Sequence, residues 1–392
     1  MLSRATFMAP TALLRCDIFC NVIDNFGDIG VCWRLARQLV GEYGLYVRLW
    51  VDDLAAFSRI CPGLNPLLRA QVCLGVDIRL WQSDFPAVGV MPGEIVIEAF
   101  ACHLPEAFVE AMAERRPKPV WINLDYLSAE SWVSGCHALP SPHPQRPITK
   151  HFFFPGFDET TGGLLRECGL IEQRDRFLAS PEEQTAFWQR IGTTCPGGGV
   201  FKVSLFAYEN PGVVPLLSAL ANTDMPAVCL APMTRTQRDI EDFLGEPVQT
   251  GDVIQRGRLE IRVLPFMAQE DYDRLLWASD LNFVRGEDSF VRAQWAARPM
   301  IWHIYPQSDD AHRVKLDAFL ERYCAELPDN LALLLKRIFL AWNGFGDFSP
   351  ELWREWLSCL PEIRRHTEIW QKNLSKQQDL CASLMRFCKS KL

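Results

Sequence analysis

The sequence predicts an α/β protein with two doubly wound domains, and three observations carry this prediction. Strand-like and helix-like segments alternate through the first half of the 392-residue chain. A Pro- and Gly-rich break follows at Cys195-Pro196-Gly197-Gly198-Gly199, and the same alternation then begins again. Because parallel strands need crossover helices, each run of alternating segments indicates one mostly parallel sheet covered by helices.

The first half contains five segments that we interpret as strands and three that we interpret as helices. The strands are expected at 14–22, 45–51, 76–81, 94–100 and 119–124, and the helices at 28–40, 53–60 and 104–115. The stretch 134–147 carries four prolines, which a regular helix does not tolerate. We therefore expect a long loop there, with a functional role because of its length.

The second half repeats this organisation and ends in helices. Strands are expected at 200–206, 228–231, 259–264, 281–284 and 300–305, and the chain beyond residue 350 is expected to be almost wholly helical. The linker is expected within 165–197. We therefore predict an N-terminal Rossmann-like domain at 1–175 and a C-terminal Rossmann-like domain at 195–364.

Composition limits the classes of partner and the compartment. The net charge of −8 disfavours broad adhesion to nucleic acid or to an acidic membrane, since both need clustered Lys and Arg. It favours a partner rich in basic residues. The 14 cysteines are scattered without a C-x-x-C pair, so we expect reduced thiols and a cytoplasmic protein.

Several common catalytic signatures are absent from the sequence. There is no P-loop, no G-x-G-x-x-G after the first strand, no G-x-S-x-G and no H-E-x-x-H. His137, His143 and His151 are scattered over a loop, and the two acids of Asp271-Tyr272-Asp273 point apart if the segment is helical. We therefore predict no metal site.

The loop after the first predicted strand carries two carboxylates, Asp24 and Asp28, at the edge where α/β proteins bind ligands. One of them is suited to act as a general base, and the other to orient that base or the acceptor. Two structural alternatives remain open. Asp28 caps the helix that begins there, and Asp24 is a turn residue.

A second polar segment, Arg285-Gly286-Glu287-Asp288-Ser289, follows a predicted strand and opens a helix. The free amides of a helix N-terminus, a hydroxyl and an Arg are suited to hold a diphosphate. Alternatively, Glu287 and Asp288 are ordinary first-turn acids that complement the helix dipole. The sequence supports both readings about equally.

Aromatic and amide side chains follow two strands of the second half. A nucleobase needs a flat apolar platform and a few hydrogen-bonding groups, which these residues supply together. Each taken singly is more typical of a core residue. The candidates are Phe206, Tyr208, Phe266, Gln269 and Tyr272.

Two long strings, 17–30 and 285–294, resemble the EarP family of elongation factor P arginine rhamnosyltransferases. The resemblance extends through Ile97-Glu98-Ala99-Phe100, Tyr126-Leu127-Ser128, Gly162-Gly163-Leu164 and Trp302-His303-Ile304-Tyr305. It implies a GT-B fold whose C-terminal helices, about 365–392, pack back on the N-terminal domain. It also implies dTDP-β-L-rhamnose as donor, elongation factor P as protein acceptor, no required metal or other cofactor, and inversion to α-rhamnosyl arginine.

The resemblance also implies roles for individual residues. Asp28 matches the proposed general base, Asp24 the carboxylate beside it, and Glu287 an acid required for activity. Positions around the diphosphate and sugar fall on Arg285, Asp288 and Ser289, and substrate contacts in the first loop on Asn25, Phe26 and Gly27. The thymidine contacts fall on Phe206, Tyr208, Phe266, Gln269 and Tyr272, where Tyr272 replaces a Phe common in relatives.

Two other functions are considered beside this one. The first is a GT-B enzyme that uses another nucleotide sugar on a glycan or small molecule. The second is a non-catalytic binding protein of the translation apparatus, against which the presence of Asp24, Asp28 and Glu287 argues.

Overall fold

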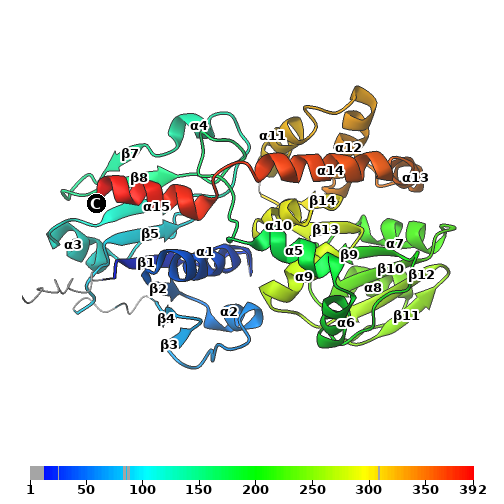
Figure 1. The fold of residues 1–392 in the computed structure, drawn as a ribbon, viewed down its shortest axis with the longest axis horizontal. Coiled ribbons are helices and arrows are strands. Elements are labelled where there is room, and N and C mark those ends of the chain that lie inside the picture. Colours follow the sequence, from blue (N-terminus) through cyan, green and yellow to red (C-terminus); the bar gives the residue numbers. More distant parts are fainter. Residues whose placement is uncertain (1–12, 25, 83–84, 86–88, 308–309) are drawn as a thin grey trace, which may run out of the picture.

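The computed structural model describes residues 13–24, 26–82, 85, 89–307 and 310–392. These residues form two sheets, each covered by helices, that lie side by side along the long axis of the molecule (Figure 1). The expected α/β architecture of two doubly wound sheets is confirmed. Within the described residues, no helix combines the length and the apolar character needed to cross a bilayer.

The N-terminal sheet has the order β3-β4-β2-β1-β5-β6-β8-β7 in the described part of the chain. Its strands are β1 (Arg15–Cys20), β2 (Tyr46–Val51), β3 (Ala70–Cys73), β4 (Val76–Leu80), β5 (Ile95–Ala99), β6 (Val120–Leu124), β7 (Pro140–Pro142) and β8 (Thr149–Phe153). Its helices are α1 (Gly27–Tyr43), α2 (Leu54–Ile60), α3 (Glu106–Glu114) and α4 (Val133–Cys136). The central strand β1 pairs in parallel with β2 and β5.

The C-terminal sheet has the order β11-β12-β10-β9-β13-β14 within the described residues. Its strands are β9 (Phe201–Leu205), β10 (Ala227–Pro232), β11 (Val253–Arg256), β12 (Leu259–Leu264), β13 (Leu281–Arg285) and β14 (Met300–His303). The surrounding helices are α7 (Val213–Ala221), α8 (Gln237–Leu244), α9 (Gln269–Ala278), α10 (Asp288–Ala296), α11 (Ala311–Tyr323) and α12 (Asp329–Trp342).

Burial explains which strands the sequence shows clearly. Every residue of β13 is buried, as is every residue of β1 after Arg15, so these strands are mostly apolar, with Asp17, Asn282 and Arg285 as the polar exceptions. The short strands β3 and β11 pair antiparallel at the sheet edges and are partly exposed. They were not predicted because half-exposed edge strands lack a strong apolar pattern.

The prediction of a long loop at 134–147 is wrong. The segment contains the end of the short helix α4 and the strand β7, which pairs antiparallel with β8 at the edge of the N-terminal sheet. Pro140 and Pro142 fit there because an edge strand leaves one side of its backbone unpaired. The proline count therefore marked a sheet edge rather than an irregular loop.

The segment expected to link the domains, 165–197, contains two helices, α5 (Leu170–Ala179) and α6 (Pro181–Arg190). After α13 (Pro350–Ser358), α14 (Leu360–Leu374) packs on α10, where the Trp370 indole donates to Gln294 Oε1 at 2.6 Å. The terminal helix α15 (Leu380–Lys391) alone crosses to the N-terminal sheet (Figure 1), and Leu380 N donates to Leu164 O at 3.0 Å. The crossing thus begins after α14, later in the chain than residue 365.

Candidate active site

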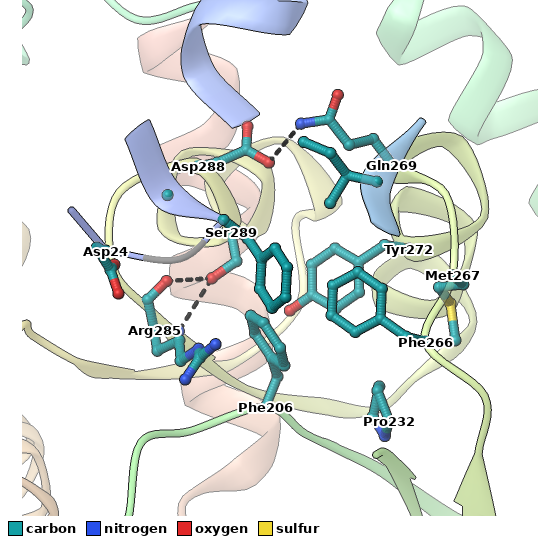
Figure 2. Close-up of a pocket in the computed structure, with 13 residues that line it drawn as sticks. Asp24, Phe206, Pro232, Phe266, Met267, Gln269, Tyr272, Arg285, Asp288 and Ser289 are labelled. Atoms are coloured by element: carbon teal, nitrogen blue, oxygen red, sulfur yellow. Dashed lines mark hydrogen bonds between the residues drawn. The ribbon is translucent and has the colours of Figure 1, made fainter. Parts of the chain in front are cut away.

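Two adjoining cavities lie between the domains, and both reach Asp24 and Gly27. We call the first, of about 570 Å³, the aromatic cavity (Figure 2); its wall includes Phe26, Phe206, Phe266, Tyr272 and Arg285. We call the second, of about 890 Å³, the acidic cavity; its wall includes Asp28, Phe100, Tyr126, Glu287, Trp302 and Lys315. The predicted site residues therefore converge on one interdomain region.

Asp28 is buried in the first turn of α1 and faces the acidic cavity. Its Oδ2 accepts hydrogen bonds from the amides of Ile23 and Asp24, both at 2.9 Å, and its Oδ1 accepts from the Tyr126 hydroxyl at 3.2 Å. Burial raises the pKa of this carboxyl. The alternative that Asp28 caps the helix is wrong, because both amides that bond to its carboxyl precede α1, so the side chain braces the loop before the helix.

Asp24 lies at the boundary between the two cavities and is held from both domains. The Tyr208 hydroxyl donates to Asp24 Oδ2 at 2.5 Å. Gly286 adopts φ +58°, and a Cβ atom there would lie 2.7 Å from Asp24 Oδ2. The carbonyl of Asp24 also accepts from Gly27 N at 2.7 Å, so the residue forms a turn as well. A side chain at position 286 would displace this carboxylate.

Glu287 precedes α10 and points toward the other domain instead of capping its own helix. Its Oε2 accepts from the Leu127 amide at 2.8 Å. Burial raises the pKa of Glu287 to about 8, and the charge of Asp28 adds to the rise, whereas Lys315 opposes it. Two carboxyl groups from different domains thus line one cavity.

Arg285 ends β13 in the aromatic cavity, where its guanidinium carbon lies 4.5 Å from the Phe206 ring centre and 4.6 Å from that of Tyr208. Burial lowers the pKa of this guanidinium. Its Nη1 is buried, and no group in the described part of the chain accepts a hydrogen bond from it. Ser289 Oγ accepts from Arg285 N at 2.9 Å and donates to Arg285 O, so this hydroxyl holds the turn that presents Arg285 (Figure 2).

Asp288 and Gln269 lie in the wall of the aromatic cavity, but their polar groups join the domains. Asp288 Oδ1 accepts from Arg34 Nε at 2.7 Å, and Oδ2 accepts from Gln269 Nε2 at 3.0 Å. Gln269 Nε2 also donates to Gly30 O at 3.0 Å. Both side chains are therefore engaged across the interface, and their contact with substrate stays a prediction.

A buried ionic network that the sequence did not reveal lies behind these two residues. Arg34 binds Asp273 through two bonds of 3.0 and 3.1 Å, and Arg292 binds the same carboxylate at 2.7 and 2.9 Å. Glu167 accepts from Arg292 Nη1 at 2.6 Å. The network joins α1 to α9 and α10. Asp273, the second acid of the D-x-D string, is thereby assigned to domain packing.

The predicted aromatic residues do meet. The rings of Phe206 and Tyr272 have centres 5.3 Å apart, and those of Phe26 and Phe266 are 4.5 Å apart. Asn25, also predicted to contact substrate, lies outside the described residues. Figure 2 shows the aromatic side chains gathered on one side of Ser289 and Arg285.

Several lining residues had no role assigned from the sequence. Tyr126 follows β6 and stacks on Phe100 with ring centres 4.5 Å apart, and Lys315 Nζ lies 5.9 Å from the Tyr126 ring centre. Tyr126 lies within a string that carried the family resemblance, and its place after a strand was the available signal. Lys315 gave none, because its helix enters the cavity only through tertiary packing.

Within the described residues, no group of three His, Cys, Asp or Glu side chains is placed to hold a metal ion. His137 Nδ1 instead accepts from the Phe154 amide at 3.1 Å. In the D-x-D string, Asp271 pairs with Arg190 at 2.8 Å, away from Asp273.

The two doubly wound domains, with paired cavities between them, define a glycosyltransferase of the GT-B type. The chain belongs to the EarP family, described as elongation factor P (EF-P) rhamnosyltransferase, whose model matches residues 16–389.

Known proteins agree with this family over nearly the whole chain. Protein-arginine rhamnosyltransferases of Pseudomonas putida and Pseudomonas aeruginosa are each 50% identical to it. The alignments cover 96% of this chain and 99% of the first relative, and 95% and 98% for the second. A solved structure concerned with EarP-mediated arginine glycosylation of translation elongation factor EF-P has TM-score 0.69 and 38% identity, covering 97% of this chain and 100% of that one.

Proposed function

We propose that this enzyme transfers L-rhamnose from dTDP-β-L-rhamnose to an arginine side chain of elongation factor P, with inversion to α-rhamnosyl arginine. One observation carries the proposal. A cavity with two carboxyl groups, Asp28 and Glu287, adjoins a cavity with an unpaired buried Arg285. The acidic cavity suits a cationic guanidinium, and the aromatic cavity suits an anionic sugar nucleotide. The family description supports rhamnose as the sugar and elongation factor P as the acceptor, and dTDP as the carrier of the sugar is part of the proposal.

On the donor side, the aromatic cavity offers a platform for thymine between Phe206, Phe266 and Tyr272. The bond from the anomeric carbon to the diphosphate oxygen breaks, and its electron pair leaves with dTDP. Arg285 stabilises the growing negative charge electrostatically, and we propose that this cation serves where other transferases use a metal ion. Transfer that continues in excess EDTA would support metal independence, and activity restored only by a divalent cation would refute it.

On the acceptor side, the difficulty is that a guanidinium has a pKa above about 12 and a poorly available lone pair. Asp28 and Glu287 orient the group, and Asp24 stands at the junction with the donor. A carboxylate is too weak a base to deprotonate arginine beforehand. We therefore assign proton transfer to Asp28 Oδ1 during or after attack of the nitrogen on the anomeric carbon.

Because single displacement needs attack opposite the leaving group, acceptor and diphosphate must approach the sugar from opposite sides. The two cavities meet at Asp24 and Gly27, which suits that arrangement. We place the reaction in the cytoplasm, in line with the translation factor as acceptor and with the fourteen cysteines, all free in the described structure.

The decisive experiment is intact-protein mass spectrometry of elongation factor P after incubation with this enzyme and dTDP-β-L-rhamnose. A gain of one deoxyhexose mass, lost when the acceptor Arg is changed to Lys, supports donor, acceptor and reaction together. Transfer to small glycan acceptors without any gain on the protein would favour the other glycosyltransferase function. Binding of the protein with no transfer of any sugar would favour a non-catalytic role.

A further inference from the structure

The hydroxyl of Tyr272 is a buried polar group without a partner. Tyr272 belongs to α9, and its ring forms part of the wall of the aromatic cavity. Among the described residues, no group makes a hydrogen bond with its hydroxyl oxygen. In Figure 2 the ring extends from α9 toward the side of the cavity where Ser289 and Arg285 lie. The hydroxyl is therefore aimed at the polar end of an otherwise apolar surface.

Such a group is unfavourable unless something else bonds to it. A buried hydroxyl that has lost water and gained no partner destabilises a protein. A Phe at this position would form the same aromatic wall without that penalty. Burial raises the pKa of Tyr272, so the hydroxyl keeps its proton and can donate at any physiological pH.

The polar neighbours are already committed to other bonds. The Ser289 hydroxyl bonds to both the amide and the carbonyl of Arg285. The two oxygens of Asp288 accept from Arg34 and from Gln269. The Ser289 hydroxyl lies near that of Tyr272 and retains one lone pair, but within the described residues no hydrogen bond to the Tyr272 hydroxyl forms. We therefore expect a ligand to supply the acceptor for the Tyr272 proton.

A second unpartnered donor, Arg285 Nη1, lines the same cavity. Arg285 also brings a buried positive charge to this cavity. Two unsatisfied donors and one buried positive charge match a group that carries several acceptor oxygens and negative charge. A phosphate group has both properties, whereas a nucleobase or a sugar ring lacks the charge.

We propose that the Tyr272 hydroxyl donates a hydrogen bond to a phosphate oxygen of the bound sugar nucleotide, beside the oxygen held by Arg285. Tyr272 is then a phosphate-binding residue as well as part of the aromatic wall. This inference rests on the proposed function, since it takes the aromatic cavity as the nucleotide-sugar site. It gives a chemical reason for Tyr at a position where a Phe would complete the platform.

The test compares the Tyr272→Phe variant with the wild-type enzyme by titration calorimetry, using dTDP and thymidine as the two probes. Because Phe retains the ring, the Kd for thymidine should stay within about twofold of the wild-type value. The Kd for dTDP should rise roughly tenfold, as expected for loss of one hydrogen bond to a charged group. In turnover assays, the KM for the sugar nucleotide should rise while kcat changes little.

The matched control is Tyr323→Phe, which removes another buried tyrosine hydroxyl, in α11 and outside the walls of both cavities, and should leave both affinities unchanged. If Tyr272→Phe weakens binding of dTDP and thymidine equally, the residue belongs to the aromatic platform alone. If the affinity for both stays unchanged, Tyr272 makes no contact with the ligand. Either result overturns the inference.

Failure of the proposed donor is distinguishable, because the wild-type enzyme itself would then not bind dTDP. In that case UDP, GDP and ADP, each paired with its nucleoside, provide the same comparison. The inference then holds only if Tyr272→Phe weakens binding of the nucleoside diphosphate and leaves binding of its nucleoside unchanged.

Discussion

The two cavities differ in charge and in how they are assembled. The aromatic cavity takes most of its wall from the C-terminal domain, with Arg285 as its buried cation. The acidic cavity draws on both domains, because Asp28 and Tyr126 come from the N-terminal domain and Glu287 and Lys315 from the C-terminal one. The proposed donor site thus lies mostly in one domain, whereas the proposed acceptor site exists only when the domains are together.

This difference separates binding from chemistry. For binding, an anionic nucleotide would need little more than the C-terminal sheet edge. The carboxyl groups that would hold a guanidinium, by contrast, meet only across the interface. The ionic network of Arg34, Asp273 and Asp288 joins the domains beside the aromatic cavity, whose wall includes Asp288. Changes in one cavity should therefore affect donor affinity, and changes in the other should affect turnover.

The largest effect is expected for Asp28→Asn, which retains the shape and the amide contacts of the side chain but removes the proton acceptor. We expect kcat to fall roughly 100-fold or more, with the Kd for dTDP within about twofold of wild type. Mass-spectrometric time courses and calorimetry measure the two quantities.

Asp52→Asn is the matched control for this prediction. Asp52 Oδ1 accepts from Val22 N at 2.9 Å and so braces the same loop from outside the acidic cavity. The Asp52→Asn substitution should lower kcat a few-fold at most. Near-normal turnover in Asp28→Asn would remove Asp28 from proton transfer, and equal losses in both variants would reduce its role to loop support.

Arg285→Gln should have the next largest effect, and it should act on the other cavity. Loss of the buried cation should raise the Kd for dTDP roughly 30-fold, since hydrogen bonds between charged groups are stronger than those between neutral groups. Thymidine should bind within a few-fold of wild type. Removing an unpaired buried charge should leave the Tm unchanged or raised, as thermal unfolding would show. Unaltered dTDP affinity would contradict the assignment of the phosphate to this cavity.

Tyr208→Phe tests the boundary between the cavities. It removes the hydroxyl that donates to Asp24 Oδ2 but retains the ring beside Arg285. Because Asp24 then loses its bond to the C-terminal domain, we expect kcat to fall about fivefold to tenfold with a smaller change in dTDP affinity. Steady-state kinetics with both substrates measure this split. A change in the donor KM alone would place the role of Tyr208 in the aromatic cavity.

Glu287→Gln should have the smallest effect, and we expect that effect on the thermal stability of the protein. Because the pKa of Glu287 rises from 4.5 to about 8 in the folded protein, the folded state retains a proton that the unfolded chain releases. The free energy of unfolding therefore decreases as pH rises through that window, and the variant escapes this loss. Its Tm should exceed that of wild type by roughly 3 °C more at pH 9 than at pH 6.

Glu110→Gln provides the surface control for this measurement, since Glu110 lies exposed beside Arg146. Its Tm difference from wild type should be the same at both pH values. An equal Tm difference at pH 6 and pH 9 for Glu287→Gln would show that its carboxyl titrates normally.

The sequence alone predicted the central strands and the sheet edge at which we propose the chemistry. Buried parallel strands such as β1 and β13 are mostly apolar, and residues that follow them lie at a sheet edge by geometry. Asp24, Asp28, Arg285 and Glu287 were identified in this way.

Only the tertiary structure decided which of these groups face one another. The bond from Tyr126 to Asp28 joins the segment after β6 to the first turn of α1, and the bonds from Arg34 to Asp273 and from Leu127 to Glu287 cross the domain interface. No local pattern encodes such contacts, because they depend on how two independently patterned domains pack. The unpaired Tyr272 hydroxyl belongs to the same class, since a lack of partners is a property of the packed interior.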